Sequence, residues 1–170
     1  MKIRREMAQA SRQDENTLLH KKSYPVNMRL YKSSSSYYNI ISTVINNMIE
    51  LLKMEFEDYK KLKGISAPNI GIPLRIIAVS KLRLRPRRVE HIVMINPEIV
   101  EEGDHRYRTR SACGSVRHKG LVPKMRRNFV RIKYIKENGR TITQGFYMDL
   151  APTIQHEIDH LNGKLITDRR

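Results

Sequence analysis

Two histidines at a helical spacing restrict the fold of this chain more than any other feature. His156 and His160 lie in the stretch IQHEIDHLNG, residues 154–163, where a separation of four residues stacks their side chains one turn apart on a helix. Asp149 and Pro152 are typical of a helix start, and the glycine that closes the stretch is typical of a helix end. An apolar stripe steps by three or four residues through Ile154, Ile158, Leu161 and Leu165. The fold must bury this stripe and place both histidines on another face.

The segment HEIDH has two interpretations. It can form an ordinary polar helix face. It also matches the pattern H-E-x-x-H, in which two imidazoles bind one divalent metal. In that pattern the glutamate, here Glu157, moves protons for a metal-bound water. A catalytic metal of this kind needs a third protein ligand and one position left open for water.

Cys113 is the candidate for the third ligand. It is the only cysteine, so it forms no disulfide within the chain, and its thiolate is a strong soft ligand. Glycine and small residues surround it in RSACGSVRHKG, which lets the backbone approach a metal closely. Two alternatives stay open: a solitary cysteine often serves as a small buried hydrophobe, and the acidic segment 98–105 offers a carboxylate ligand instead.

The patterns before this segment predict a helix and then strands. A serine-rich loop over residues 32–38 can cap a helix that ends at Gly64. The apolar positions of this helix are Ile41, Val44, Ile45, Met48, Leu51, Leu52 and Phe56. Residues 75–82 and 91–100 predict two strands separated by a basic, proline-containing loop.

A hairpin is predicted next, in the segment NFVRIKYIKENGRTITQGF. Its residues alternate on both sides of Asn138-Gly139, the pair that best tolerates the positive φ angles of a type I′ turn. The order of helix, strands and helix predicts an α+β fold. We expect antiparallel sheets packed around the C-terminal helix that carries H-E-x-x-H, and a longer helix near the N-terminus.

Composition favours one globular domain. Of 170 residues, 39% are apolar and 29% charged, and no run approaches the roughly 18 consecutive apolar residues of a membrane helix. Residues 1–17 show no periodicity, so we expect a flexible N-terminal segment followed by one domain over residues 18–170. These first residues include acids and no apolar stretch, unlike an export or transit signal. We therefore expect the cytoplasm, with a mitochondrion or other organelle as the alternative.

The positive charge suggests a polyanionic partner. Lysine and arginine total 33 against 17 acidic residues, giving a formal net charge of +16 that attracts polyanions at low salt. Aromatic residues make up only 6%, too few for a base-stacking surface interleaved with the charge. We expect at most loose association with the ribosome or RNA, no membrane partner, and a monomer.

Three segments together resemble the motifs of the peptide deformylase family, whose members remove the formyl group from the initiator methionine of new chains. GISAPNIGIP, residues 64–73, is similar to a motif of glycine, an apolar residue, two small residues, a variable position and glutamine. SACGSV, residues 111–116, is similar to a motif of glutamate, glycine, cysteine, leucine and serine. QHEIDHLNG, residues 155–163, matches the third motif, and the likeness covers roughly residues 18–170.

This resemblance implies a metal-dependent hydrolase that acts on N-formylmethionyl nascent peptides. The metal ligands would be Cys113, His156 and His160. Fe²⁺ is the expected metal, and Zn²⁺ or Ni²⁺ could occupy the same site. Glu157 would take a proton from the attacking water and pass it to the departing amine.

The resemblance also implies four further contacts. The side-chain amide of Asn69 and the backbone N–H of Gly114 would hold the developing oxyanion. Gly64 would border the pocket for the methionine side chain, and Lys124 would donate to a peptide carbonyl of the substrate.

Four positions depart from the family pattern. Asn69 replaces glutamine and is one methylene shorter, so its amide would fall short of the substrate unless the loop moves inward. Ser111 replaces glutamate and Gly114 replaces leucine, which removes a carboxylate and loosens the loop. Lys124 replaces arginine and offers one ammonium in place of a planar fork. The metal ligands and the base are intact.

The same motifs leave two rival functions open. A zinc-dependent peptidase with H-E-x-x-H needs a third ligand after the helix, and only Asp168 could serve there. A deformylase-like protein with little turnover, acting as a basic module bound to ribosome or RNA, would explain the charge and the altered second motif. Activity on a formyl-methionyl peptide separates that protein from the enzyme.

Overall fold

The computed structural model describes residues 18–57, 63–84, 87–111 and 122–168. The predicted flexible segment at residues 1–17 lies outside this part of the chain, as do the predicted site residues Cys113 and Gly114. Within the described part, helices and antiparallel strands occupy separate stretches of sequence, which confirms the predicted α+β class. None of the helices described there is long and apolar enough to cross a membrane.

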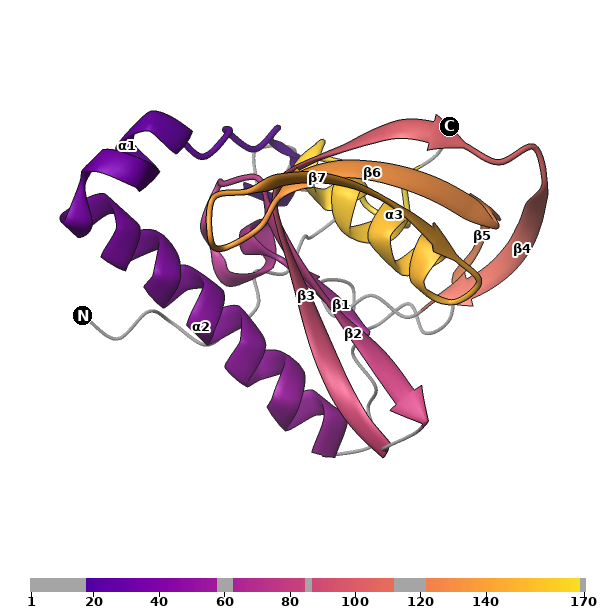
Figure 1. Ribbon diagram of the computed structural model, residues 1–170. Coiled ribbons are helices and arrows are strands. Elements are labelled where there is room, and N and C mark those ends of the chain that lie inside the picture. Colours follow the sequence, from indigo (N-terminus) through magenta and orange to yellow (C-terminus); the bar gives the residue numbers. More distant parts are fainter. Residues whose placement is uncertain (1–17, 58–62, 85–86, 112–121, 169–170) are drawn as a thin grey trace.

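The elements alternate in blocks along the chain. The helices are α1 (Met28–Ser33), α2 (Ser35–Glu57) and α3 (Leu150–Leu161), with short 3₁₀ turns η1 (Leu18–His20) and η2 (Ala67–Ile70). The strands are β1 (Gly64–Ser66), β2 (Ile76–Leu84), β3 (Arg87–Glu102), β4 (Arg106–Ser111), β5 (Val122–Arg127), β6 (Phe129–Ile135) and β7 (Thr141–Tyr147). Five strands form one antiparallel sheet in the order β1-β2-β3-β6-β7, and β4 pairs with β5. Figure 1 shows α3 inside the curve of the strands, with α2 on the other side of β1 and β2.

Strand β2 separates two apolar cores because its side chains alternate between the faces of the sheet. Ile76 and Ala78 join the core beneath α2, whereas Ile77 and Val79 join the core around α3. All four side chains are fully buried. One face of the large sheet therefore packs against α3 and fixes its position.

The serine-rich stretch at residues 32–38 is mostly helical, so the predicted loop was wrong. Helix α1 ends at Ser33 and α2 begins at Ser35, with one residue between them. The Oγ of Ser34 accepts a hydrogen bond from the Tyr37 N–H at 3.3 Å, as the predicted serine cap should. A single capping residue is enough to start the second helix directly after the first.

Two predictions about glycine also need correction. The β6–β7 hairpin forms as predicted, but only Gly139 has a positive φ, of 77°, so the turn is not type I′. The Gly139 N–H donates to the Lys136 carbonyl at 2.8 Å, and the Asn138 side chain accepts from the Arg140 N–H. Gly64 begins strand β1 and does not end a helix.

Helix α3 has the predicted position and more extensive burial than predicted. It starts after Asp149, whose exposed side chain makes no capping bond and pairs with Lys63 at 3.5 Å. Gly163 follows its end with φ of 71°. Its buried residues are Ala151, Pro152, Ile154, Gln155, Glu157, Ile158, His160 and Leu161. Burial extends beyond the apolar stripe because β1, β2, β5 and β7 pack around the helix.

Candidate active site

The two histidines lie side by side on α3. His160 is 1% exposed and His156 is partly buried. Their imidazole rings meet edge to face with centroids 4.7 Å apart. The helical spacing therefore brings the rings together as predicted.

Both imidazoles are neutral at pH 7. Burial lowers the pKa of His156 to about 4, and the nearby cations Arg126 and Lys124 act in the same direction. Burial lowers the pKa of His160 to about 3, with His156 as the next cause. A neutral imidazole has a ring nitrogen with a lone pair for a metal, so both rings are in the metal-binding form.

Glu157 is a buried carboxyl held against β1. Burial raises its pKa to about 8, while a hydrogen bond with the Ser66 side chain and the charge of Arg126 oppose this rise. Its Oε2 has no hydrogen-bond partner among the described residues. A Cβ at Gly64 would lie only 2.9 Å from Glu157 Oε1, so the absence of a side chain there lets the strand and the carboxyl approach each other.

Asn69 lies in η2, directly after β1, and its side chain turns back towards Ser66. The Asn69 Oδ1 accepts hydrogen bonds from the Ser66 N–H at 2.8 Å and from the Ser66 Oγ at 2.6 Å. A backbone N–H can only donate, so the atom facing it must be the amide oxygen. The Nδ2 group of Asn69 therefore points away from Ser66.

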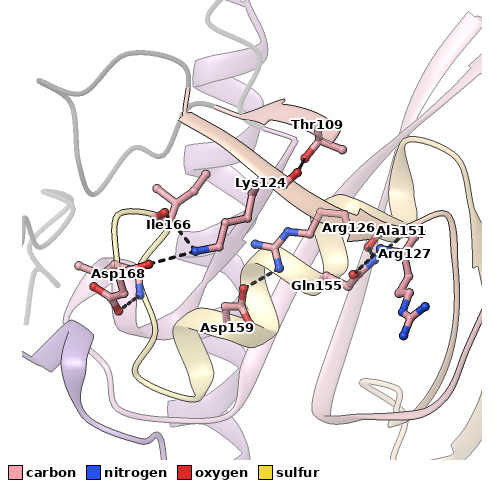
Figure 2. A network of polar contacts seen from close by, with 10 residues as sticks. Thr109, Lys124, Arg126, Arg127, Ala151, Gln155, Asp159, Ile166 and Asp168 are labelled. Atoms are coloured by element: carbon pink, nitrogen blue, oxygen red, sulfur yellow. Dashed lines mark hydrogen bonds and ion pairs between the residues drawn. The ribbon is translucent and has the colours of Figure 1, made fainter. Parts of the chain in front are cut away.

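Lys124 lies on β5 and contacts the chain segment that follows α3. Its Nζ donates to the carbonyl of Ile166 at 3.4 Å and to that of Asp168 at 3.3 Å (Figure 2). An ammonium carries three donors, so these bonds still allow the predicted contact with a substrate carbonyl. Lys124 also lies close enough to His156 to affect its pKa.

An arginine that the sequence analysis did not single out lies beside the histidines. Arg126 is 7% exposed, and its Nη1 pairs with Asp159 Oδ2 at 2.6 Å. The Gln155 side chain donates to the Arg127 carbonyl and accepts from the Arg127 N–H, so a second contact joins β5 to α3 (Figure 2). In the sequence, Arg126 lies in the basic stretch at residues 124–127, and no spacing in that stretch relates it to Asp159.

The described residues fit part of a metal site. Two adjacent neutral imidazoles are suitable donors for a divalent ion, and the Oε2 of Glu157, on the same helix, lacks a hydrogen-bond partner among those residues. No group of three His, Cys, Asp or Glu side chains that could hold an ion occurs in the described part of the chain. The predicted third ligand, Cys113, lies outside that part.

Comparisons with known proteins agree on one family. The polypeptide deformylase family matches residues 14–170. A peptide deformylase of Buchnera aphidicola is 33% identical over 129 residues, which cover 75% of this chain and 71% of the relative. One from Pseudothermotoga lettingae is 32% identical over 130 residues, again 75% and 71%. The structure of a class I type b peptide deformylase from Acinetobacter baumannii with bound Met-Ala-Ser has a TM-score of 0.78 and 27% identity, covering 96% of each chain.

Proposed function

The chain belongs to the peptide deformylase family of hydrolases, and we propose that it removes the formyl group from the initiator methionine of nascent polypeptides. The observation that carries this proposal is the group on α3 formed by the partly buried His156 and the buried Glu157 and His160. The related structure from Acinetobacter baumannii holds Met-Ala-Ser, which corresponds to a substrate after loss of its formyl group.

The reaction adds water to the formyl carbon, breaks the carbon–nitrogen bond, and leaves formate and a free amine. A divalent metal, when bound, polarises the formyl oxygen and makes water a better nucleophile. Glu157 takes the proton from the attacking water and passes it to the leaving nitrogen. The carboxylate form needed for this step is favoured by any cation placed next to the buried acid.

Four residues support the charge that develops on the formyl oxygen or bind the peptide. The Nδ2 of Asn69, on the side of its amide opposite Ser66, is a donor for the oxyanion. We assign a second donor to the Gly114 N–H on the motif alone. Gly64 leaves room beside β1, and the third donor of Lys124 is available for a substrate carbonyl.

The metal is proposed to be Fe²⁺, bound by Cys113, His156 and His160, with Zn²⁺ or Ni²⁺ as substitutes. Two imidazoles and one thiolate leave a position for water. We predict about one equivalent of metal per parent chain and far less in Cys113→Ala, measured by elemental analysis after anaerobic purification. Full metal retention by Cys113→Ala would reject this ligand set.

Turnover of a formyl-Met-Ala-Ser peptide by the nickel-loaded protein tests the proposed function. Glu157→Gln keeps the shape of the side chain and removes the base, so we predict a loss of roughly 10²- to 10⁴-fold in kcat with normal metal content. An inactive parent with full metal content would reject the deformylase function. Loss of metal in Glu157→Gln would mean that Glu157 is a ligand or a structural residue.

Finer properties are proposed on less direct grounds. The relatives named above are bacterial, and we propose that this chain acts in the cytoplasm as a monomer. The net charge of +16 supports a loose, salt-sensitive association with the ribosome or RNA, close to the source of its substrates.

A further inference from the structure

Gln155 joins helix α3 to the two-stranded sheet of β4 and β5, which we call the β4–β5 ribbon. Among the described residues these two strands pair only with each other. In the sequence Cys113 lies between them, two residues after the end of β4. We propose that Gln155 is a positioning residue, which docks the β4–β5 ribbon on α3 and so brings the proposed third ligand to the two histidines of that helix. This inference rests on the metal ligands of the proposed function.

The first observation is that the Gln155 side chain takes the place of a neighbouring strand on the edge of β5. Its Oε1 accepts from the Arg127 N–H at 3.0 Å, and its Nε2 donates to the Arg127 carbonyl at 2.8 Å (Figure 2). A residue of an antiparallel strand would make the same two bonds. The second hydrogen of Nε2 goes to the Ala151 carbonyl at 3.0 Å, so the orientation of this buried amide is fixed.

The second observation is that α3 carries its proposed ligands and its contacts with β5 as interleaved pairs. Gln155 and Asp159 are one helical turn apart, and each directly precedes a histidine. Asp159 pairs with Arg126 at 2.6 Å, so consecutive residues of β5 bind the helix. One stripe of α3 therefore holds β5, and the neighbouring stripe carries the imidazoles. Because the stripes are one residue apart, a shift of β5 changes the surroundings of the imidazoles.

The third observation is that the Gln155 contact lies at the base of the ribbon. β5 ends at Arg127, and β6 of the large sheet begins two residues later. The far end of the ribbon is the pair of Ser111 and Val122, and Cys113 follows Ser111 by two residues. At the usual rise per residue this end is about 17 Å from Arg127, so a rotation of about 5° at the base moves it by about 1.5 Å. Metal–ligand distances tolerate only about 0.2 Å, so this rotation is enough to weaken a ligand there.

Methionine at position 155 would remove both bonds to β5 and keep the length of the side chain. The Arg127 N–H and carbonyl would then face an apolar group, and backbone groups without partners are costly to bury. The ribbon should therefore rotate away from α3 until water reaches them. The ion pair of Arg126 and the bonds of Lys124 to the segment after α3 remain, so the rotation is limited and the protein still folds. Gln155→Met should weaken the thiolate contact without abolishing metal binding.

Binding of Co²⁺ to the metal-free full chain under anaerobic conditions tests this inference. A cobalt–thiolate bond absorbs in the near ultraviolet, so the parent should show this band. Gln155→Met should weaken the band and raise the Kd of Co²⁺ by roughly 10-fold, the lower end of the effect of groups that orient metal ligands. In a Cys113→Ala background, Gln155→Met should change the Kd by less than about twofold, because Gln155 acts through the ligand that the ribbon carries.

Gln144→Met is the matched control. Gln144 lies on β7, which carries none of the proposed ligands, and its Oε1 accepts from the Tyr134 hydroxyl at 3.1 Å. This variant makes the same substitution and should keep both the Kd and the band. Equal effects of Gln155→Met and Gln144→Met would overturn the positioning role. A Gln155→Met effect that persists undiminished in Cys113→Ala would also overturn it, because a general loss of helix packing acts equally in both backgrounds.

Cobalt binding keeps this inference separate from the proposed function, because it requires no turnover. If the parent shows the thiolate band but does not turn over formyl-Met-Ala-Ser, the deformylase function fails, and the Gln155→Met result still decides the positioning role. If the parent shows no thiolate band, Cys113 is not a ligand, and the positioning role fails with it.

Discussion

The charge state of Glu157 links the chemistry of the site to the stability of the fold. Burial raises the pKa of its carboxyl to about 8, so the metal-free protein keeps a neutral acid at pH 7. Burial lowers the pKa of the neighbouring histidines, because their charged form is the protonated one and burial makes it unfavourable. All three groups therefore prefer to be neutral without metal, and a bound cation would favour the carboxylate.

The stability of the metal-free protein should therefore depend on pH on both sides of about 6.5. Below this value, the unfolded chain protonates His156 and His160 at their ordinary pKa of 6.5 while the folded chain does not, so stability falls as pH falls. Between the ordinary 4.5 and about 8, the folded chain keeps a proton on Glu157 that the unfolded chain loses. Below pH 6.5 the two protons bound by the histidines of the unfolded chain outweigh the one proton that Glu157 keeps in the folded chain. Above pH 6.5 mainly the Glu157 proton differs between the two states, so stability falls as pH rises.

Comparing Glu157→Gln with the parent isolates the acid from all other titrations. From pH 6.5 to 8 the variant should gain stability over the parent by at most about 1.4 kcal/mol per pH unit, the value for one proton. Urea unfolding of both metal-free proteins at pH 5, 6.5 and 8 measures this difference. A difference independent of pH would show that the carboxyl of Glu157 is already ionised in the fold.

Asn69 offers a second test at the scale of one residue. From the sequence, its shorter side chain falls short of the substrate unless the loop moves inward. In the structure, the turn closes around this side chain, which is 4% exposed and bonded twice to Ser66. We predict that Asn69→Gln lowers kcat, by up to about 10²-fold, since the longer amide no longer fits between those donors. Steady-state kinetics with a formyl peptide will decide, and increased activity would contradict the observed packing.

At the scale of elements, the contact between β1 and α3 sets the position of Glu157, the proposed base. A Cβ on Gly64 would lie 2.8 Å from Thr153 Cγ2 and 2.9 Å from Glu157 Oε1, closer than such atoms approach. We predict that Gly64→Ala displaces the Glu157 carboxyl and lowers kcat by roughly 10-fold or more, with metal content retained. Gly103→Ala is the control, because its Cβ would be similarly crowded, 3.0 Å from Phe129 Cβ, but at the end of β3. Equal kcat values for the two variants would contradict this role of the contact.

Helices and strands could be predicted from the sequence better than the contacts between them. Helix α3 and the stacking of His156 and His160 followed from a local period of 3.6 residues, so they could be predicted. The pairing of Arg126 with Asp159 could not, because it joins β5 to α3 across 33 positions of sequence. The same holds for Ser66 and Glu157, which meet only when β1 packs on α3. Local patterns indicate the histidines proposed as ligands, whereas the groups that shift their pKa come from tertiary packing.

At the scale of the whole molecule, the net charge of +16 should act independently of the catalytic site. The basic residues are spread over several elements: Arg106 and Arg108 are exposed on β4, and Arg29 and Lys32 are exposed on α1. In Figure 1 these two elements lie at opposite ends of the molecule. A charge distributed in this way attracts polyanions without a defined interface.

Charge reversal at the two ends tests this distribution. We predict that Arg106→Glu/Arg108→Glu and Arg29→Glu/Lys32→Glu weaken binding to single-stranded RNA to a similar extent, each lowering the slope of log K against log salt by about 0.7 for every phosphate that is no longer neutralised. Fluorescence anisotropy over a range of salt concentrations measures the slope. Turnover of a short formyl peptide should stay unchanged in both variants, because among the described residues neither pair has a side-chain bond to Asn69, His156, Glu157 or His160. If the β4 variant alone abolished binding, the association would depend on one defined surface, and the diffuse attraction expected from the composition would be wrong.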